Sequence, residues 1–338
     1  MYRSPRSLPI LTWATLLSIA LVAPVHAQAR LSGMVFADAQ DALHGYSVPA
    51  DSSTFRFRRV QFTLDQDLDS VFAVRLQLEA DDNELTSKGK ASVFLKQAWL
   101  RWSHLGAAGD MIMGLSTTPT WALAESYWGY RSLEKTVLDL QGFGFASDLG
   151  VALLRAPAPG HPFGWHLMLA NGSGQKPENN ASKKLSLSLP YRFGNCVVEG
   201  LGEYEGETGP RDKWLAKLFG GWQKGPDGAG IEAFRRVNAS AGLAGADVIP
   251  MGVSAFGHVK LAAAWRAVAR VDWFDPDTEV KNAGYREMLW LAALDATPHA
   301  NVHLMPNVEI RGYSAKASAL PSRKADVALR LTLHYSYK

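Results

Sequence analysis

Residues 327–337, at the end of the chain, constrain the fold more than any other segment. One parity is apolar and ends in aromatic residues: Val327, Leu329, Leu331, Leu333, Tyr335 and Tyr337. The other parity is mostly polar: Ala328, Arg330, Thr332, His334 and Ser336. Because alternate side chains of a strand point to opposite faces, the segment predicts a strand between an apolar medium and water. The edge of a soluble sandwich also alternates, but the closing tyrosines favour a membrane-spanning β-barrel with an aromatic girdle.

The N-terminus has the features of a secretory signal. Arg3 and Arg6 precede an apolar run over residues 8–22, which is too short for a membrane anchor. Small residues then allow cleavage after Ala27, or alternatively after Ala29. We therefore expect a signal peptide over residues 1–27 and an exported β-barrel over residues 28–338. The sequence has no second uncharged apolar run of 18 residues, so a barrel is the remaining way for the chain to cross a bilayer.

Charge and cysteine content say little about partners. The chain has 35 Lys and Arg against 32 Asp and Glu, which gives no reason to expect a nucleic acid partner. Cys196 is the single cysteine, so an internal disulfide is excluded and we read it as a small strand residue. Selectivity for any solute must therefore come from where individual charges lie.

Segments of about ten residues with partial alternation recur along the chain and predict sixteen strands. They cover residues 31–38, 55–66, 71–80, 92–102, 110–118, 146–155, 164–171, 183–193, 196–205, 213–223, 230–238, 250–258, 264–274, 285–295, 301–313 and 325–337. The connections between them alternate between long and short, as the outer loops and periplasmic turns of a bacterial barrel do. The sequence therefore predicts an all-β, antiparallel transmembrane barrel.

Charged residues on the polar parity of these strands are expected to face the lumen, because a charge on the lipid face costs about 2–4 kcal/mol at the midplane. The cations placed there are Arg59, Arg75, Arg101, Arg192, Arg266, Arg270, Arg311 and Arg330, and the acidic residues are Glu79, Asp148, Glu199, Glu203, Asp272 and Glu309. Two strands do not fit this pattern. Lys96 shares its parity with apolar residues, and residues 288–295 are apolar on both faces. A bulge, a subunit contact or a different register would explain either one.

The connection over residues 119–145 is the longest, and such loops are usually functional or disordered. It is rich in aromatic and aliphatic residues, so we expect it to be ordered and to pack inside the barrel, where it would narrow the lumen. An outer cap or a contact between subunits is the alternative. Its charged residues are candidates for the constriction: Glu125, Arg131, Glu134, Lys135 and Asp139.

Several motifs resemble the phosphate-selective porin O/P family and its relatives. They are Phe55-Arg-Phe-Arg-Arg-Val-Gln-Phe-Thr-Leu, Leu95-Lys-Gln-Ala-Trp-Leu-Arg-Trp, Gly114-Leu-Ser-Thr-Thr-Pro and Glu125-Ser-Tyr-Trp-Gly-Tyr-Arg-Ser-Leu-Glu-Lys-Thr. The resemblance extends over residues 30–175. It implies a sixteen-stranded, homotrimeric channel of the Gram-negative outer membrane, with the third loop folded into the pore. The chain departs from the family in the mixed charge of this loop and in Lys338, which follows the last aromatic residue.

We therefore expect an outer-membrane porin that contacts lipid and lipopolysaccharide and passes small hydrophilic solutes or ions, with anions such as phosphate as candidates. The sequence leaves the preference between anions and cations open. A plugged barrel with a structural or adhesive role is the main alternative. No nucleophile–base–acid arrangement, cysteine-supported histidine pair or phosphate-binding glycine loop stands out, so we expect no enzymatic activity, metal or other cofactor.

Overall fold

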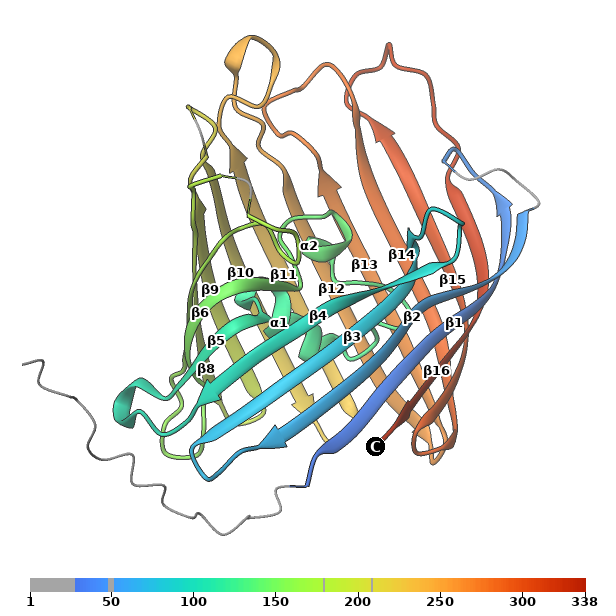
Figure 1. Ribbon diagram of the computed structural model, residues 1–338. Coiled ribbons are helices and arrows are strands. Elements are labelled where there is room, and N and C mark those ends of the chain that lie inside the picture. Colours follow the sequence, from blue (N-terminus) through green and yellow to red (C-terminus); the bar gives the residue numbers. More distant parts are fainter. Residues whose placement is uncertain (1–27, 48–51, 179, 208) are drawn as a thin grey trace, which may run out of the picture.

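The computed structural model describes residues 28–338 except residues 48–51, 179 and 208, so the expected signal peptide lies outside the described residues. Within the described chain, sixteen antiparallel strands form one closed barrel in which β1 pairs with β16. Figure 1 shows the tilted strands running between short turns at one end and longer loops at the other. The predicted fold class is confirmed. Among the described residues, no helix has the length and apolarity needed to cross a membrane.

The strands follow one another around the barrel in chain order. Their bounds are β1 Arg30–His44, β2 Ser52–Asp67, β3 Phe72–Leu85, β4 Ala91–Trp102, β5 Asp110–Thr117, β6 Ser147–Arg155, β7 Trp165–Ala170, β8 Lys184–Phe193, β9 Cys196–Glu205, β10 Lys213–Lys224, β11 Asp227–Asn238, β12 Met251–Ala262, β13 Trp265–Asp275, β14 Tyr285–His299, β15 Val302–Ala315 and β16 Asp326–Tyr337. Each predicted segment overlaps one of these strands. The structure also has two short 3-10 helices, η1 Gly106–Ala108 and η2 Leu243–Gly245, and two α-helices, α1 Pro119–Trp128 and α2 Val137–Leu140, in its described part.

Several strands are longer than their alternation predicts, at both ends of the barrel. The first strand was expected to end at residue 38 and continues to His44, and the third continues from residue 80 to Leu85. Outside the lipid layer both faces of a strand meet water, so the apolar parity is no longer required there. Backbone pairing between neighbouring strands continues nevertheless, as the pairs Gln40–Thr54 and Gln40–Arg330 show.

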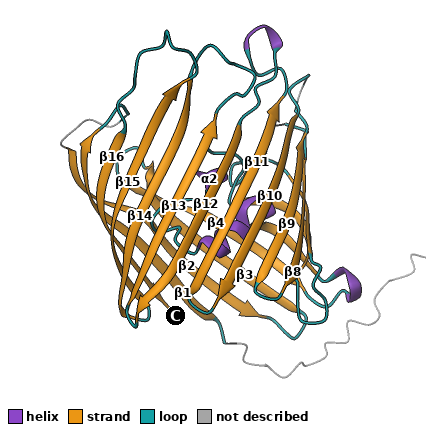
Figure 2. Ribbon diagram, turned by 180° about the vertical axis from the view of Figure 1, so that it is seen from behind, coloured by secondary structure: helices purple, strands orange, loops and turns teal. Residues whose placement is uncertain are grey.

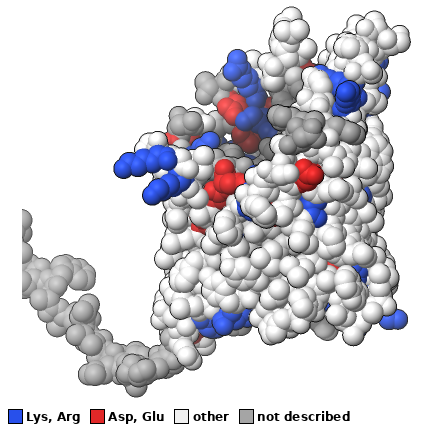
Figure 3. Space-filling view, turned by 90° about the vertical axis from the view of Figure 1, so that its right-hand side faces the viewer, with Lys and Arg blue, Asp and Glu red and all other residues white. Residues whose placement is uncertain are grey.

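The outer surface of the barrel is an apolar belt. Exposed hydrophobic side chains occur on strands all around it, among them Phe62, Leu76, Leu187, Leu218 and Leu331. Figure 3 shows one side of this surface, where Lys, Arg, Asp and Glu gather mainly near the long loops and the opposite rim. The opposite parity of the strands is polar and buried inside the barrel, as Thr63, Ser188 and Thr332 are. This distribution is that of a barrel in lipid with a polar interior.

The register of the last strand agrees with its sequence pattern. Leu329 and Leu331 are exposed on the outside, whereas the Thr332 side chain is fully buried inside and its hydroxyl donates to Asp38 Oδ1 at 2.7 Å. Thr332 also accepts a hydrogen bond from the Asn307 amide at 3.0 Å. The lumenal face of β16 is therefore already filled at this level and is joined to β1 and β15 by hydrogen bonds.

A charge on the outer face of β16 should disrupt the protein. We expect Leu331→Arg to destabilise the folded barrel by about 2–4 kcal/mol, because the guanidinium would face hydrocarbon near the middle of the strand. Ala328→Arg is the matched control, since Ala328 lies on the inner face beside a cavity near the long loops. Folding yield into lipid vesicles, measured from urea, compares the two variants. Equal yields would show that the register of β16 is wrong.

Candidate functional site

The segment between β5 and β6 forms a compact structure of its own. Pro119 begins α1, where its missing N–H is not needed, and Gly129 ends the helix in the left-handed conformation with φ 66°. The backbone then turns and continues into α2. Thr118 and Phe145 hold the ends of this segment together, because the Thr118 hydroxyl donates to the Phe145 carbonyl at 2.6 Å. Figures 1 and 2 both draw α1 and α2 within the outline of the barrel.

Apolar side chains of this segment pack against inward-facing side chains of the barrel. Trp128 and Leu133 belong to one buried cluster with Phe219 of β10 and Phe256 of β12. Trp121 and Leu138 belong to a second cluster, which includes residues of β9, β10, β11 and β13. Burial of this apolar surface stabilises the segment against one side of the barrel wall.

This packing explains why β14 is apolar on both faces. Leu289, Leu291 and Ala293 point inward and join the cluster around Trp128. Trp290 and Leu294, on the other parity, are exposed on the outer surface. Neither a bulge nor a register change is needed, since the inner face of β14 is covered by the segment between β5 and β6.

Arginines from other strands bind the backbone of the same segment. Arg58 of β2 donates to the Ser132 carbonyl, and Arg270 of β13 donates to the Lys135 carbonyl. Arg330 of β16 donates to the Leu133 carbonyl at 3.2 Å. A stretch of four residues is thus held from three separate strands, by charge-assisted hydrogen bonds that are stronger than neutral ones.

Two β-bulges place extra cations on the inner wall. The pairing of β1 with β2 skips Arg58, and the pairing of β3 with β4 skips Lys96. Arg58 and Arg59 therefore both point inward, as do Lys96 and Gln97. A bulge inserts one extra residue and so exchanges the faces of the residues that follow. Among the explanations open for Lys96, the bulge is the correct one.

Glu79 of β3 lies between the two bulges and pairs with Arg59, which follows the residue added by the first bulge, and with Lys96, which the second bulge adds. Its carboxylate is 3.3 Å from Arg59 Nε and 3.3 Å from Lys96 Nζ, and it also accepts a hydrogen bond from Gln61. Glu79 is almost completely buried. Arg59 and Lys96 are thereby held in place by a carboxylate that has little contact with the lumen.

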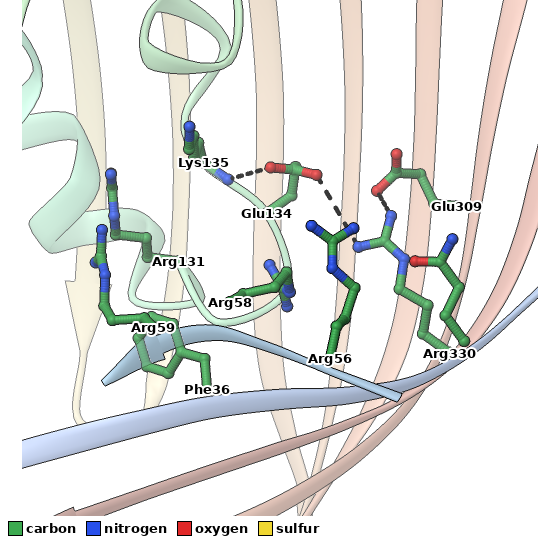
Figure 4. Close-up of a pocket in the computed structure, with 10 residues that line it drawn as sticks. Phe36, Arg56, Arg58, Arg59, Arg131, Glu134, Lys135, Glu309 and Arg330 are labelled. Atoms are coloured by element: carbon green, nitrogen blue, oxygen red, sulfur yellow. Dashed lines mark hydrogen bonds and ion pairs between the residues drawn. The ribbon is translucent and has the colours of Figure 1, made fainter. Parts of the chain in front are cut away.

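A cavity of about 290 Å³ lies between this wall and the segment that follows α1. Figure 4 shows its arginines extending from β2, from β16 and from the loop toward a common space. The lining residues are Phe36, Gln40, Arg56, Arg58, Arg59, Arg131, Glu134, Lys135, Glu309 and Arg330. Six of them are cationic and two are acidic, so the lining is positively charged. We refer to this space as the arginine cavity.

Most of the balancing carboxylates lie behind the guanidinium groups. Asp38 accepts from Arg58 Nη2 at 3.2 Å, and its side chain has no exposed surface. Glu79 balances Arg59 in the same way. Arg56 is paired through two hydrogen bonds with Asp82, at 2.6 and 3.0 Å. A solute in the cavity would therefore meet the guanidinium groups of Arg56, Arg58 and Arg59 before the carboxylates that balance them.

The charges on the loop are organised around Arg131. Its Nη1 lies 2.5 Å from Asp139 Oδ2 and also contacts Glu125. Burial by itself would lower the pKa of the Arg131 guanidinium, but Asp139 and Glu125 raise it above its usual value. Burial likewise acts to raise the pKa of Glu134, and the nearby Arg330 and Arg58 instead hold it below its usual value. Both groups are therefore charged at neutral pH.

The structure brings some of the predicted site residues together and separates others. Arg59, Arg131, Glu134, Lys135 and Arg330 line the arginine cavity, and Arg311 lines an adjoining cavity nearer the long loops. Glu125 and Asp139 lie behind Arg131.

The remaining predicted residues lie elsewhere on the inner wall. Arg270 is buried, paired with Asp272 and stacked near the Trp128 ring. Arg266 pairs with Asp295 below the loop, on the side of the short turns. Arg75 pairs with Asp65 of β2, and Arg101 lies opposite Ile112 of β5.

Sequence reasoning did not select Arg56, Arg58, Gln40 or Phe36 for the site. A signal for the first two is present around residues 55–62. Phe55 and Phe57 are apolar on odd positions, whereas Val60 and Phe62 are apolar on even ones. This switch in parity occurs at Arg58 and Arg59 and indicates the bulge. No comparable signal marks Gln40 or Phe36.

No family model matches this chain, and no curated protein matches it. Solved structures do. An anion-selective porin from Comamonas acidovorans aligns with a TM-score of 0.67 at 10% identity, over 92% of this chain and 100% of the other. The outer-membrane channel DcaP of Acinetobacter baumannii aligns with a TM-score of 0.67 at 12% identity, over 92% and 97%. This chain has the fold of an outer-membrane porin.

Other barrels of the same kind agree with this result. OmpF of Salmonella typhi, in complex with daunomycin, aligns with a TM-score of 0.63 at 8% identity, over 92% of this chain and 98% of the other. The porin fold supports a location in the Gram-negative outer membrane. The narrower resemblance to phosphate-selective porins stays a prediction, because no match bears on that subfamily.

Proposed function

We propose that this protein is an outer-membrane porin that allows passive diffusion of small hydrophilic solutes and favours anions. The observation that carries the proposal is the arginine cavity, where cations from β2, β16 and the loop surround one space. A ring of charge at a narrow point raises the local concentration of ions of the opposite sign. Phosphate is one candidate solute. The anion-selective porin among the similar structures fits the same reading.

In this proposal the segment over residues 119–145 narrows the pore from one side. Its apolar surface is covered by β9 to β15, and its charged residues Arg131, Glu134 and Lys135 face the cavity. Solutes would pass along the opposite wall, which is formed by β1, β2 and β16. The loop would thus act as a fixed constriction rather than as a moving lid.

A plugged barrel is the second candidate function, and one observation favours it. Trp128, Leu133, Val137 and Leu138 are fully buried, so the loop fills a large part of the interior. Purified protein in planar lipid bilayers separates the two functions. Stepwise ion conductance supports the porin, whereas a folded protein that never conducts supports the plug. We also propose a homotrimer in contact with lipopolysaccharide, which cross-linking in native membranes would test.

Removing cations from the arginine cavity should reduce the preference for anions. We expect the double variant Arg56→Gln, Lys135→Gln to lower the chloride-to-potassium permeability ratio, measured as the reversal potential in a KCl gradient. Both residues line the cavity, and loss of their charge weakens the local potential. The double variant Arg211→Gln, Lys224→Gln removes the same charge at exposed positions outside the cavity and should leave the ratio unchanged. Equal effects of the two changes would contradict the proposal.

A further inference from the structure

The outer surface of the barrel has an apolar groove between β8 and β12, with a volume of about 620 Å³. Lipid-facing side chains of these two strands form its walls: Leu187, Leu189, Met251 and Val253. Small residues of the strands between them form its floor: Gly200, Gly202, Ala216 and Ala233. Figure 2 shows the five strands in the same part of the barrel wall. We refer to this space as the lipid-side groove.

The two glycines on the floor of the groove are not required by the backbone. Neither Gly200 nor Gly202 has a positive φ, and the pairing of β9 with β8 and with β10 runs past both residues without a bulge. A Cβ atom added to either one would meet no heavy atom within 4 Å. Glycine weakens a strand, because it loses more conformational freedom on folding than alanine does. Where neither a turn nor a bulge needs it, an interior glycine indicates that a ligand or another chain approaches the backbone closely.

An exposed cation lies at the end of the groove nearer the long loops. Arg235 of β11 lines the groove and shares its outward parity with the exposed Ile231. Within the described part of the chain, no hydrogen bond or ion pair reaches the Arg235 guanidinium. A charge on the lipid face is costly in hydrocarbon and is tolerated only near the interface. Arg235 therefore needs an anion that the surrounding membrane supplies.

Aromatic residues place Arg235 just below the outer interface. Tyr204 and Trp214 lie together on β9 and β10, with ring centroids 4.3 Å apart, and the Tyr204 hydroxyl donates to Asp212 at 2.8 Å. Outward aromatic residues of this kind mark the level of the lipid headgroups. Arg235 pairs with Ala216, which lies two residues from Trp214, or about 7 Å along the strand. An arginine side chain is long enough to bring its guanidinium from there to the headgroups.

We infer that the lipid-side groove binds lipid A of lipopolysaccharide, with an acyl chain over Gly200 and Gly202 and a phosphate group on Arg235. The long-loop end of a bacterial barrel faces the outer leaflet, where lipid A supplies both groups. A planar guanidinium can form two parallel hydrogen bonds with a phosphate, which a neutral headgroup does not offer. The inference rests on the lipopolysaccharide contact proposed above, and it makes no use of the channel activity.

A second copy of the chain fits this face less well than a lipid does. Trp214 and Leu218 project beside the groove with 53% and 70% of their surface exposed, so they would hold another barrel wall away from the glycines. Contact with another apolar wall would also bury Arg235, and a buried charge without a partner is costly. An acyl chain is narrow enough to lie between the projecting side chains, and the phosphate neutralises the guanidinium.

Titration of the purified, folded protein with lipids tests the site. Native mass spectrometry in detergent measures how much protein carries bound lipid A, with its two phosphates, dephosphorylated lipid A or phosphatidylglycerol. The wild type should bind lipid A about tenfold more tightly than the dephosphorylated form, because only the former makes a charge-assisted bond with Arg235. Binding of phosphatidylglycerol as tight as that of lipid A would overturn the assignment to lipid A.

Two variants separate the phosphate contact from the acyl-chain contact. Arg235→Gln should remove the preference for phosphorylated lipid A, whereas the control Arg155→Gln should keep it, since Arg155 ends β6 on the short-turn side. Gly202→Leu fills the floor of the groove without a clash and should weaken binding of both forms of lipid A about tenfold. The control Gly257→Leu changes a lipid-facing glycine outside the groove, where an added Cβ also meets only ordinary contacts, and should bind like the wild type.

Each result supports the site or overturns it. If Gly202→Leu does not fold, Gly200→Leu makes the same test, because an added Cβ there also meets open space. Lipid A affinity that is unchanged in Arg235→Gln and in the folded glycine variant would overturn the site. A glycine variant that changes the mass of the oligomer but not lipid binding would assign the groove to a second copy instead. A wild type that never conducts but shows the expected lipid affinities would contradict the porin function and leave the lipid site in place.

Discussion

Removing the segment between β5 and β6 should raise the single-channel conductance several-fold. Residues 120–143 can be replaced by a short glycine-serine linker, because Thr118 already bonds with Phe145 and with Ala146 across the gap. The deletion removes both helices and the stretch that lines the arginine cavity, so the path through the barrel widens. The measurement is single-channel current in planar bilayers at a fixed KCl concentration.

The deletion also exposes apolar side chains of the inner wall, including Phe219, Phe256 and Leu291, so we expect a lower unfolding temperature as well. Only folded protein with a β-dominated far-UV spectrum is compared. Deleting residues 240–246, the exposed part of another outer loop that includes Leu243, is the control and should leave conductance unchanged. A folded deletion variant with wild-type conductance would place the segment outside the ion path. A wild-type protein that does not conduct, together with a deletion variant that does, would instead favour the plugged barrel.

The barrel could be predicted from the sequence because lipid imposes one simple rule on every strand. Each span must be apolar on its outer parity, and this rule produced the number and order of the strands. The rule does not apply beyond the lipid layer, which is why the ends of β1 and β3 were placed too early. Strand pairing there depends on backbone hydrogen bonds, which leave no pattern in the side chains.

The inner face of the barrel is harder to predict, because the residue type at each inward position depends on the side chains that pack against it. Leu289 and Leu291 look misplaced on a lumenal face until the loop that covers them is known. The bulges at Arg58 and Lys96 do leave a switch in parity, but a switch does not show which side chains it brings together. Arg58, Arg330 and the loop come together only because the barrel closes. β2 ends at Asp67 and β16 begins at Asp326, yet β1 alone separates the two strands in the sheet.

Arg131 illustrates the difference between predicting a charge and predicting its role. The sequence suggests a cation that faces passing anions, with Glu125 and Asp139 as balancing charges. In the structure the Arg131 side chain is only 12% exposed and sits between both carboxylates, although it also borders the arginine cavity. Its charge therefore has two roles: it contributes to the cavity lining, and it joins α1 to α2.

Replacing Arg131 with glutamine should consequently have a large effect on both selectivity and stability. Loss of the guanidinium leaves Glu125 and Asp139 without their shared partner, and breaking a largely buried pair in this way costs about 3–5 kcal/mol. The local charge also changes from one cation facing two carboxylates to two unbalanced carboxylates. We therefore expect the reversal potential in a KCl gradient to move toward cations and the unfolding temperature to fall.

Restoring the charge balance separates these two roles. The triple variant Arg131→Gln, Glu125→Gln, Asp139→Asn removes the unpaired carboxylates, so the loop should regain most of its stability because no buried charge lacks a partner. The net charge of these three residues is −1 in the wild type, −2 in the single variant and 0 in the triple variant. If Arg131 contributes to the field at the constriction, the triple variant should therefore recover much of the anion preference that the single variant loses. A single variant with unchanged reversal potential would remove Arg131 from the ion path. Lost selectivity that persists in a stable triple variant would instead show that the guanidinium itself is required in the cavity, beyond its effect on the local charge.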